Sequence, residues 1–352
     1  MLEPGWSLRD EMASSIVRDD SGGTYSLREE NIVSTEQAQS LCPPSRVGRR
    51  SLSWPILGAL SLVLVCFSLG RWLAAGVGSV DPGSDPMPTW QLVLMHALEW
   101  IQFGAFLAIM WSVVVIPLLQ RRPLGFDGLY VIAAFLLNFW DVMDNYWVFA
   151  LQYNAHHLNV GSWGAFIPGW HSPQPELWAV PIGFVFGAYT WAFYLAVVSG
   201  CRLLAAMESR HPSWGPVRGF GVVFLSNMII AAVSENVYLR IGAIANISPF
   251  EPLTLWDGTE HAFPLYNPVL FSLAWTALTA LRWYRDQNGL TVVERFLPVG
   301  KLGRRATTML RFLAISACLQ VTYLLFYFLP FNIFAVMRTA PPNVFPSYFP
   351  VP

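Results

Sequence analysis

Asp141, Asp144 and Asn145 lie in a stretch that is otherwise as apolar as a membrane-spanning helix, DGLYVIAAFLLNFWDVMDNYWVFA at residues 127–150. Because a charge near the centre of a bilayer costs several kcal/mol, such side chains face a protein interior or a wet cavity and often mark a site. Carboxyl groups in a poorly solvated chamber do not all ionise alike, so a neutral acid stands beside an ionised base. This pairing suits acid-catalysed cyclisation, dehydration or isomerisation of a lipophilic substrate.

The spacing of these residues places them on one side of an expected helix. Asn138, Asp141 and Asn145 are three and four residues apart and share a helical stripe, with Asp144 one position round. An uncharged polar group such as Asn138 more often supplies a hydrogen bond between helices. We therefore take Asp141 and Asp144 as the catalytic candidates of this stretch.

Polar side chains recur in two more apolar stretches: His96, Glu99 and Gln102 in residues 90–119, and Asn227, Ser234, Glu235, Asn236 and Tyr238 in residues 217–241. At 1.5 Å per residue, Glu99 and Asp141 lie roughly 13 Å, and Glu235 roughly 8 Å, below the outer boundary. The helices run in different directions, so nothing local forces their acids to one depth. We therefore expect one polar chamber, open to the exoplasmic side, with Glu99 as its third catalytic residue.

The external loop at residues 151–177 adds binding candidates. It has no Lys or Arg, it contains three His and two Trp residues, and its Gly and Pro residues are typical of an ordered lid. A Trp at this level is also typical of an anchor at the membrane interface. The expected substrate-binding residues are His96, Asn145, Tyr146, Asn154, Trp163, Trp170, Glu235 and Asn236.

The composition indicates an integral membrane protein. Of the 352 residues, 54% are hydrophobic and 12% are charged, whereas about 25% of an ordinary soluble domain is charged. Seven stretches are long enough to cross a bilayer as helices: residues 54–76, 90–119, 127–150, 178–204, 217–241, 263–283 and 309–330. They lack the alternation of polar and apolar residues that is typical of β-barrel strands. We expect an all-α, multi-pass bundle of seven transmembrane helices in the cell membrane.

The basic residues predict the orientation, because positively charged loops stay in the cytoplasm. With the N-terminus inside, 18 of the 21 Lys and Arg residues lie in the N-terminal tail, in the loops after the second, fourth and sixth spans, or at the span ends that border these loops. Only Arg71, Arg240 and Arg338 lie elsewhere. Seven spans then place the C-terminus on the exoplasmic side. The expected domains are a disordered cytoplasmic tail at 1–52, the transmembrane domain at 53–337 and a Pro-rich tail at 338–352.

Other chemistries fit the sequence less well. His96 and Glu99 could join the two aspartates in a metal site, but the His-rich repeats of membrane di-iron oxygenases are missing, and we expect neither metal nor cofactor. A diphosphate site at DVMDN needs Mg²⁺ and basic partners, which are almost absent on that side. A retinal-type receptor needs a lysine in a span, and the one Lys, Lys301, lies in a cytoplasmic loop. A transporter remains an alternative, because acids within the membrane are common in transporters. No internal repeat or broken helix pair favours it.

Four segments resemble the AveC-like spirocyclase family of actinobacterial membrane proteins: DVMDNYWVFALQYN, NVGSWGAFIPGW, ENVYLRIGAIANISPF and LWDGTEHAFPLYNP. The likeness covers roughly residues 95–300 and is a spread of aromatic, Gly, Asp and Asn positions. It implies spiroketal formation in polyketide biosynthesis, a part of secondary metabolism. In that reaction a dihydroxyketone closes to a hemiketal, loses water to give an oxocarbenium ion, and is captured by its second hydroxyl.

Chemistry and position give the roles that we assign. Asp141 or Asp144 is the general acid on the departing hydroxyl, and the other, or Glu99, is the base or cation stabiliser. Asn145 and Tyr146 orient substrate oxygens. The hypothesis is a metal-free membrane cyclase for a lipophilic polyketide-like small molecule, with the lipid bilayer as its other partner and no nucleic acid. The alternatives are a membrane terpene cyclase, and a non-enzymatic transporter or proton-coupled channel.

Overall fold

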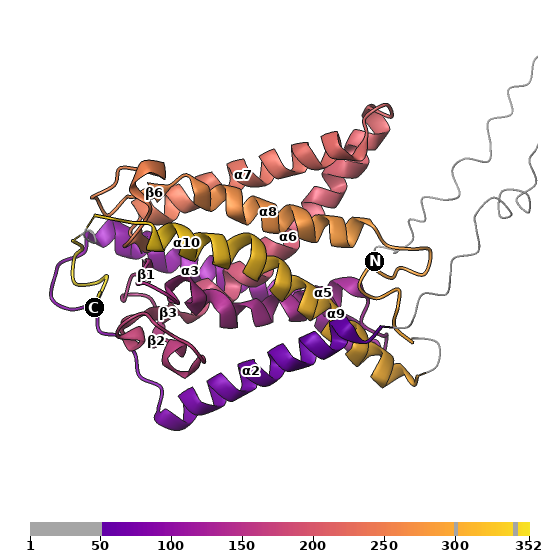
Figure 1. Ribbon diagram of the computed structural model, residues 1–352, viewed down its shortest axis with the longest axis horizontal. Helices are drawn as coiled ribbons and strands as arrows, with labels where there is room; N and C mark the ends of the chain where they lie inside the picture. Colours follow the sequence, from indigo (N-terminus) through magenta and orange to yellow (C-terminus); the bar gives the residue numbers. More distant parts are fainter. Residues whose placement is uncertain (1–50, 299–301, 341–343) are drawn as a thin grey trace, which may run out of the picture. The chain divides into compact units, whose positions relative to one another are not determined.

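The computed structural model describes residues 51–298, 302–340 and 344–352. Six helices of the described part are long and apolar enough to cross a membrane (Figure 1). They are Ser53–Ala75 (α2), Thr89–Leu119, Phe126–Asn145, Ile182–Arg210 (α6), Pro216–Arg240 (α7) and Arg304–Val336. The expected all-α membrane bundle is confirmed. The tail predicted at residues 1–52 lies, except for its last two residues, outside the described part.

The stretch at residues 263–283 forms a shorter helix, α8 (Tyr266–Trp283), of 18 residues. Asn267 and Arg282 near its two ends make it less apolar than the six long helices. It runs alongside α7 within the bundle (Figure 1). Seven stretches are thus helical as expected, and six of them have the length and hydropathy of a span.

Two of the long helices contain one π-helical turn next to a proline. The first consists of α3 (Thr89–Met110), η1 (Trp111–Val115) and α4 (Ile116–Leu119), and the second of α9 (Arg304–Tyr323), η6 (Leu324–Phe328) and α10 (Leu329–Val336). Pro117 and Pro330 follow the turns. Because proline lacks an N–H and its ring clashes with the preceding turn, the wider π turn lets each helix continue past it.

The third span changes its helix type halfway. α5 (Phe126–Leu136) is α-helical, and the next nine residues form the 3₁₀ helix η2 (Leu137–Asn145). Runs of 3₁₀ helix longer than about four residues are uncommon, and a stretch within a helix often marks a functional segment. The prediction of one regular helix over residues 127–150 is therefore wrong in its second half, and the helix ends at Asn145.

Side chains from distant segments hold η2 in place. Trp163 Nε1 donates a hydrogen bond of 2.9 Å to the carbonyl oxygen of Phe139. Asn332 Nδ2, from α10, donates one of 2.7 Å to the carbonyl oxygen of Met143. Backbone carbonyl groups of the span are thus bonded to residues far along the chain, which a local reading of the sequence does not reveal.

Short strands and turns cover one end of the bundle, and we call residues 146–181, 242–265 and 344–352 the cap (Figure 1). Its antiparallel pairs are β1 (Leu151–Tyr153) with β4 (Ile244–Asn246), β2 (Asn159–Gly161) with β3 (Ala179–Pro181), and β5 (Thr254–Leu255) with β6 (Phe263–Pro264). Its 3₁₀ turns are η3 (Gly164–Phe166), η4 (Pro175–Leu177) and η5 (Glu251–Leu253). The loop expected to be an ordered lid is thus built of strands and turns.

The C-terminal residues take part in the cap. The N–H of Ala155 donates a hydrogen bond of 2.8 Å to the carbonyl oxygen of Tyr348. Gln152 Nε2 donates one of 2.5 Å to the carbonyl oxygen of Pro350. Phe349 is buried. The described end of the Pro-rich tail therefore packs against strand β1 and the turn that follows it.

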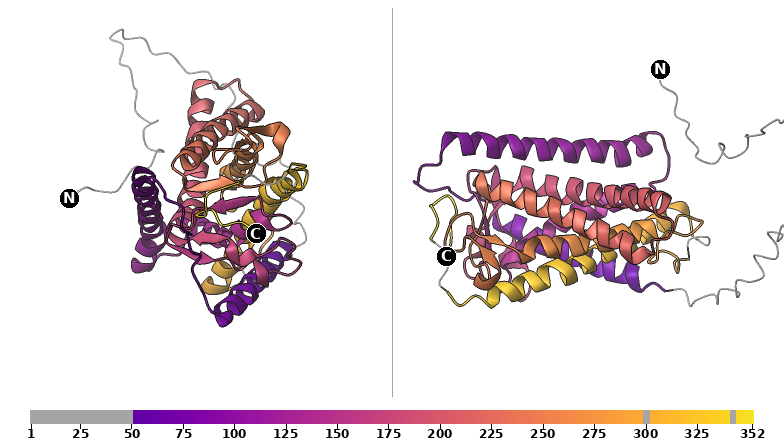
Figure 2. Two further views of the ribbon diagram at one scale, coloured as in Figure 1. Left: turned by 90° about the vertical axis from the view of Figure 1, so that its left-hand side faces the viewer. Right: turned by 90° about the horizontal axis from the view of Figure 1, so that it is seen from above.

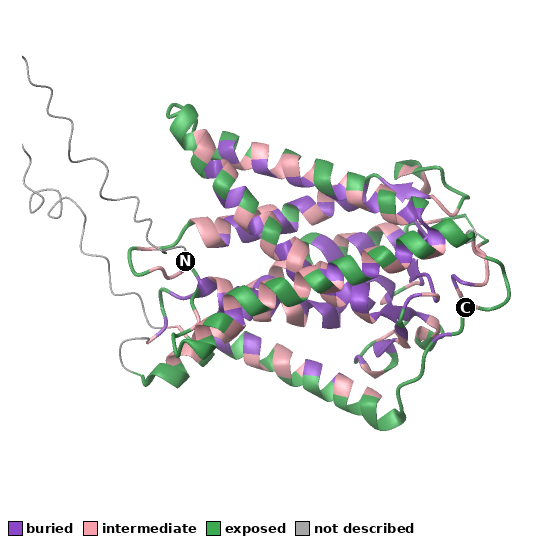
Figure 3. Cartoon of the chain, turned by 180° about the vertical axis from the view of Figure 1, so that it is seen from behind, coloured by how far each residue is buried: buried purple, intermediate pink, exposed green. Residues whose placement is uncertain are grey.

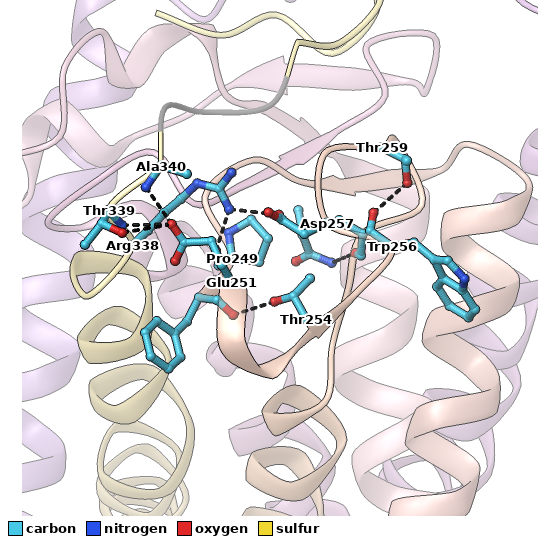
Figure 4. A network of polar contacts seen from close by, with 12 residues as sticks. Pro249, Glu251, Thr254, Trp256, Asp257, Thr259, Arg338, Thr339 and Ala340 are labelled. Carbon is cyan, nitrogen blue, oxygen red and sulfur yellow. Dashed lines mark hydrogen bonds and ion pairs between the residues drawn. The ribbon is translucent and has the colours of Figure 1, made fainter.

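A network of polar contacts ties the cap to the end of α10 (Figure 4). Arg338 Nη1 forms an ion pair of 2.9 Å with Asp257 Oδ1. Glu251 Oε1 accepts hydrogen bonds from the backbone N–H groups of Thr339, at 2.9 Å, and Ala340, at 2.5 Å. These contacts join the segment around η5 to the residues that follow the last helix.

The six long helices differ in how far the bundle buries them (Figure 3). We compared the buried share of an 18-residue apolar stretch in each helix. This share is 72% in Phe126–Asn145 and 11% in Thr89–Leu119. α3 lies at the edge, as the purple helix in Figure 2 shows. The span that carries Asp141 and Asp144 is therefore the central one.

Two glycines let α3 approach α6 closely. Gly183 and Gly187 are four residues apart, a spacing of small residues that is typical of close contacts between membrane helices. A Cβ atom at Gly183 would lie 2.7 Å from Glu99 Cγ, and one at Gly187 would lie 2.7 Å from the backbone of Gln102. The polar stripe of α3 is thus pressed against α6.

Candidate active site

A cavity of about 340 Å³ lies inside the bundle next to the cap. Side chains of η2, α6, α7, α8 and η6 form its walls, and β1 and β4 contribute at the end toward the cap. Most of the lining is apolar or aromatic, with Phe184, Phe193, Trp275 and Tyr327 among its residues. Sites for small molecules commonly measure about 300–1,000 Å³ and combine such walls with a few polar groups. The cavity has the size and lining of such a site.

Three carboxyl groups from two separate helices reach this cavity. Asp141 and Asp144 come from η2, and Glu235 comes from α7. All three residues are buried, with 1%, 2% and 6% of their surfaces exposed. The structure thus brings together, in one mostly apolar space, acids that are about ninety residues apart in the sequence.

The 3₁₀ form of η2 sets the direction of the two aspartates. In a helix with three residues per turn, side chains three apart are eclipsed. Asn138, Asp141 and Asp144 therefore lie in one line along η2, whereas the α-helical stripe that we expected joined Asn138, Asp141 and Asn145. Both aspartates consequently face the cavity, and Asn145 does not.

Two phenol groups hold one oxygen of Asp141. Tyr153 Oη and Tyr189 Oη donate hydrogen bonds of 2.9 and 2.8 Å to Asp141 Oδ1. Tyr323 Oη in turn donates one of 3.1 Å to Tyr189 Oη. Burial, and then the neighbouring Asp141 carboxyl, raise the pKa of the Tyr153 phenol well above its usual value. This phenol in the cap therefore keeps its proton and stays a hydrogen-bond donor.

The carboxyl of Asp144 lies within electrostatic reach of both other acids, Asp141 and Glu235. Its Oδ1 atom is buried and has no hydrogen-bond partner among the described residues, and the same holds for Asp141 Oδ2. Glu235 Oε1 accepts a long hydrogen bond of 3.4 Å from Asn246 Nδ2 of β4. Two carboxyl oxygens of residues that line the cavity thus have no hydrogen bond within the described part of the protein.

No ion pair between described residues includes any of these three acids. Asp127, in the first turn of α5, pairs instead with Arg282 of α8 at 2.9 Å. Three like charges in a mostly apolar space repel one another strongly, and burial disfavours the charged form. A shared proton among the cavity acids is therefore favoured.

Glu99 does not join the cavity. Its Oε2 atom lies 3.3 Å from His96 Nδ1 and 3.3 Å from His157 Nδ1. His157 belongs to the cap and is buried. The structure thus places the predicted catalytic Glu99 and the predicted substrate-binding His96 in a separate cluster between α3, α6 and the cap, where histidine partners surround the carboxyl.

Two predicted binding residues, Asn145 and Asn154, hold backbone in the cap. Asn145 Oδ1 accepts hydrogen bonds from the N–H groups of Ala150, at 2.7 Å, and Leu151, at 2.8 Å. Asn154 Nδ2 donates one of 2.7 Å to the carbonyl oxygen of Gly242. Both amides use their polar atoms within the protein, and neither lines the cavity.

The aromatic candidates of the cap also lie away from the cavity. Tyr146 Oη donates a hydrogen bond of 3.2 Å to the carbonyl oxygen of Pro168. The Tyr146 ring packs edge-on against Trp170, with 5.8 Å between the ring centroids. Trp163 bonds to η2, as described above. Asn236 of α7 donates a hydrogen bond to its own helix, at the carbonyl oxygen of Ala232. Of the predicted binding residues, Glu235 lines the cavity.

The structure adds wall residues that the sequence analysis did not select. Tyr189, Trp191 and Phe193 come from α6, and Trp275 comes from α8. Neither helix carries an acid in its apolar part, and aromatic residues at alternate positions, as in α6, do not follow a helical stripe. Tyr153 could have been predicted as a site residue from the sequence, because it is a polar aromatic residue directly before Asn154 in the loop that we expected to be a lid.

The described residues contain no cluster of three or more His, Cys, Asp or Glu residues suited to hold a metal ion. The cavity presents carboxyl groups, the phenols bonded to them and aromatic faces. Together they can donate a proton, accept one, and stabilise a cation on carbon.

Comparison with known proteins identifies one family. The family described as Spirocyclase AveC-like matches residues 120–352, which is more than half of the chain. No curated protein and no solved structure matches. The match includes the last long helix, which the resemblance at residues 95–300 did not, and every residue that lines the cavity; it leaves out Glu99 and His96. The chain therefore belongs to the AveC-like spirocyclase family.

Proposed function

We propose that this protein forms spiroketals from lipophilic, polyketide-like dihydroxyketones by acid–base catalysis in the cavity. Family membership indicates an enzyme with a cyclase role in polyketide biosynthesis. The observation that carries the finer proposal is the group of three acids without basic partners, in a mostly apolar cavity of ligand size. The six membrane-spanning helices agree with a substrate that dissolves in lipid.

The reaction requires one acid and one base. The first hydroxyl adds to the ketone and gives a hemiketal. The acid then protonates the hemiketal hydroxyl, which departs as water and leaves an oxocarbenium ion. The second hydroxyl attacks this ion, and its proton passes to the base. The sum is the loss of one water, and proton exchange between the two carboxyl groups restores the starting state.

We assign Asp144 as the acid and Asp141 as the base. Asp141 accepts two hydrogen bonds from phenols, which stabilise a carboxylate. Asp144 Oδ1 has no such donor among the described residues and lies within reach of two other carboxyl groups, so it is the group that gains most from carrying a proton. Glu235 strengthens this preference through its own negative charge.

The walls of the cavity suit the cationic intermediate. Aromatic faces attract a cation at distances below about 6 Å, and Phe193, Phe271, Trp275 and Tyr327 line the space beside the aspartates. The scarcity of polar wall atoms keeps bulk water from capturing the oxocarbenium ion. The second hydroxyl of the substrate is then the nearest nucleophile.

The direct test is turnover by the purified protein in detergent at neutral pH, with a long-chain dihydroxyketone. We expect spiroketal, detected by mass spectrometry as the loss of one water, and one stereoisomer in excess over the buffer reaction. A transporter acts only across a sealed membrane and would give no product in detergent. Product at the rate and stereochemistry of buffer alone would refute the proposal.

A further inference from the structure

The residues of the cavity wall that are exposed on the protein surface lie on α6 and α7. Three lining residues are exposed, namely Leu195 and Ser199 on α6 and Ile230 on α7. Leu195 is 47% and Ile230 is 53% exposed. Described lining residues from η2, η6, β1 and β4 are buried. The cavity therefore reaches the surface of the bundle through one side.

We propose that the substrate enters the cavity sideways from the bilayer, through an opening between α6 and α7 that we call the lateral opening, formed by Leu195, Ser199 and Ile230. This inference rests on the proposed function for the identity of the substrate. The route itself rests on where the walls are exposed and on how deep in the membrane they lie.

The lateral opening lies at the level of lipid chains. Ile230 precedes the end of α7, Arg240, by ten residues, or about 15 Å along the axis. Leu195 is thirteen residues, about 20 Å, from the start of α6 at Ile182. Since the hydrocarbon core is about 30 Å thick, both positions fall near the middle of the bilayer. A molecule that enters here comes from lipid.

The end toward the cap is closed. Leu151 and Tyr153 of β1 and Ile244 of β4 line the cavity there, and all three are buried. β1 and β4 are hydrogen-bonded as an antiparallel pair, with Tyr153 opposite Ile244. A path from water through this end would have to separate the two strands.

The cavity walls carry acids toward the cap and apolar residues toward the lateral opening, as a substrate that arrives from lipid requires. Tyr189, which is bonded to Asp141, precedes Leu195 by six residues on α6, and Glu235 follows Ile230 by five on α7. The acids thus lie toward the cap, about 8–9 Å along the helices from the lateral opening. An amphiphilic molecule can place its oxygens among the carboxyl groups while its apolar chain points toward lipid.

Ile229 and Ile230 offer a matched pair of substitutions. Both are isoleucines in α7 and both are exposed, at 61% and 53%, but the cavity is lined by Ile230 and not by Ile229. In protein reconstituted in lipid nanodiscs, we expect Ile230→Trp to lower kcat/KM about tenfold or more, with a smaller effect on kcat. Ile229→Trp is expected to leave both unchanged. Leu195→Trp, on the opposite rim, gives a second obstruction if Ile230→Trp does not accumulate.

Binding can be followed without turnover. A long-chain dihydroxyketone with a diazirine in its tail is added to the nanodiscs and photolysed, and labelled peptides of α6 and α7 are quantified. We expect Ile230→Trp to reduce this labelling several-fold and Ile229→Trp to leave it as in wild type. If Ile230→Trp and Leu195→Trp both label and turn over as wild type does, the lateral opening is refuted while the proposed function stands. If labelling depends on Ile230 but no spiroketal forms, the route stands and the proposed function fails.

Discussion

Tyr189 Oη lies 2.8 Å from Asp141 Oδ1 and donates a hydrogen bond to it. Tyr153 donates a second hydrogen bond to the same oxygen from the cap, so that one carboxyl oxygen joins α6, η2 and β1. The other oxygen of Asp141 has no partner among the described residues and lies at the cavity. The arrangement fixes the aspartate through one oxygen and leaves the other without a hydrogen bond among the described residues.

Removing one of these phenol hydroxyls is expected to slow turnover without unfolding the protein. Tyr189→Phe keeps the ring and deletes one hydrogen bond to a charged group, worth about 1.5–3 kcal/mol. We expect kcat to fall about 10–100-fold, with KM little changed. Tyr194→Phe, on the same helix but outside the cavity lining, is the control. Normal kcat in Tyr189→Phe would show that Asp141 does not need this donor.

Glu99 is expected to stabilise the protein rather than to take part in the reaction. Its carboxyl is buried between His96 and His157, and replacing it with Gln leaves polar atoms less well satisfied. Losses of this kind cost about 1–3 kcal/mol. We therefore expect Glu99→Gln to lower Tm by several degrees and to retain kcat per folded molecule. A loss of kcat by two orders of magnitude at unchanged Tm would return Glu99 to the mechanism.

Gly187 is expected to be essential for the packing of α3 on α6. A Cβ atom there would lie 2.7 Å from the backbone of Gln102, which cannot move aside as a flexible side chain can. Gly187→Ala is expected to lower Tm and the amount of protein in membranes. Gly104→Ala, on α3, is the matched control, because its Cβ would meet nothing within 4 Å. Equal Tm values for the two variants would contradict the close contact.

The network at the end of α10 is expected to persist in acid. Backbone N–H groups, that of Ala340 first, lower the pKa of Glu251 from its usual value to about 2. A carboxyl whose pKa is lowered on folding stabilises the folded state at pH values above its unfolded-state pKa, about 4.5. This stabilisation is lost as the pH falls toward 2. We expect hydrogen exchange of the Thr339 and Ala340 amides to stay slow at pH 5 and to rise below pH 3. Glu251→Gln should show faster exchange already at pH 7, and an unchanged rate would argue against the network.

The helices and the cavity acids were predictable because their signals are local. A run of about twenty apolar residues marks a span wherever the chain folds, and an acid within such a run must face the interior. Asp141, Asp144 and Glu235 follow this rule. Depth within the membrane also placed Glu99 at their level, but depth does not give the direction in which a side chain points.

The rest depended on contacts between distant segments. Glu99 lies against α6 because Gly183 leaves room for it, and its partner His157 comes from a loop without periodic pattern. The 3₁₀ helix η2, whose form turns Asp144 toward the cavity, accepts hydrogen bonds from the distant Trp163 and Asn332. No feature of residues 137–145 alone predicts these partners.

The most direct test of the account compares Asp144→Asn, Asp141→Asn and Asp81→Asn in nanodiscs, with the amount of folded protein measured for each. Asp81 is exposed, lies outside the cavity and undergoes the same chemical change. Because general acid catalysis contributes about 10²–10⁴-fold, we predict a loss of that size in spiroketal formation for Asp144→Asn and Asp141→Asn, and wild-type turnover for Asp81→Asn. Full turnover by both cavity variants would contradict the account.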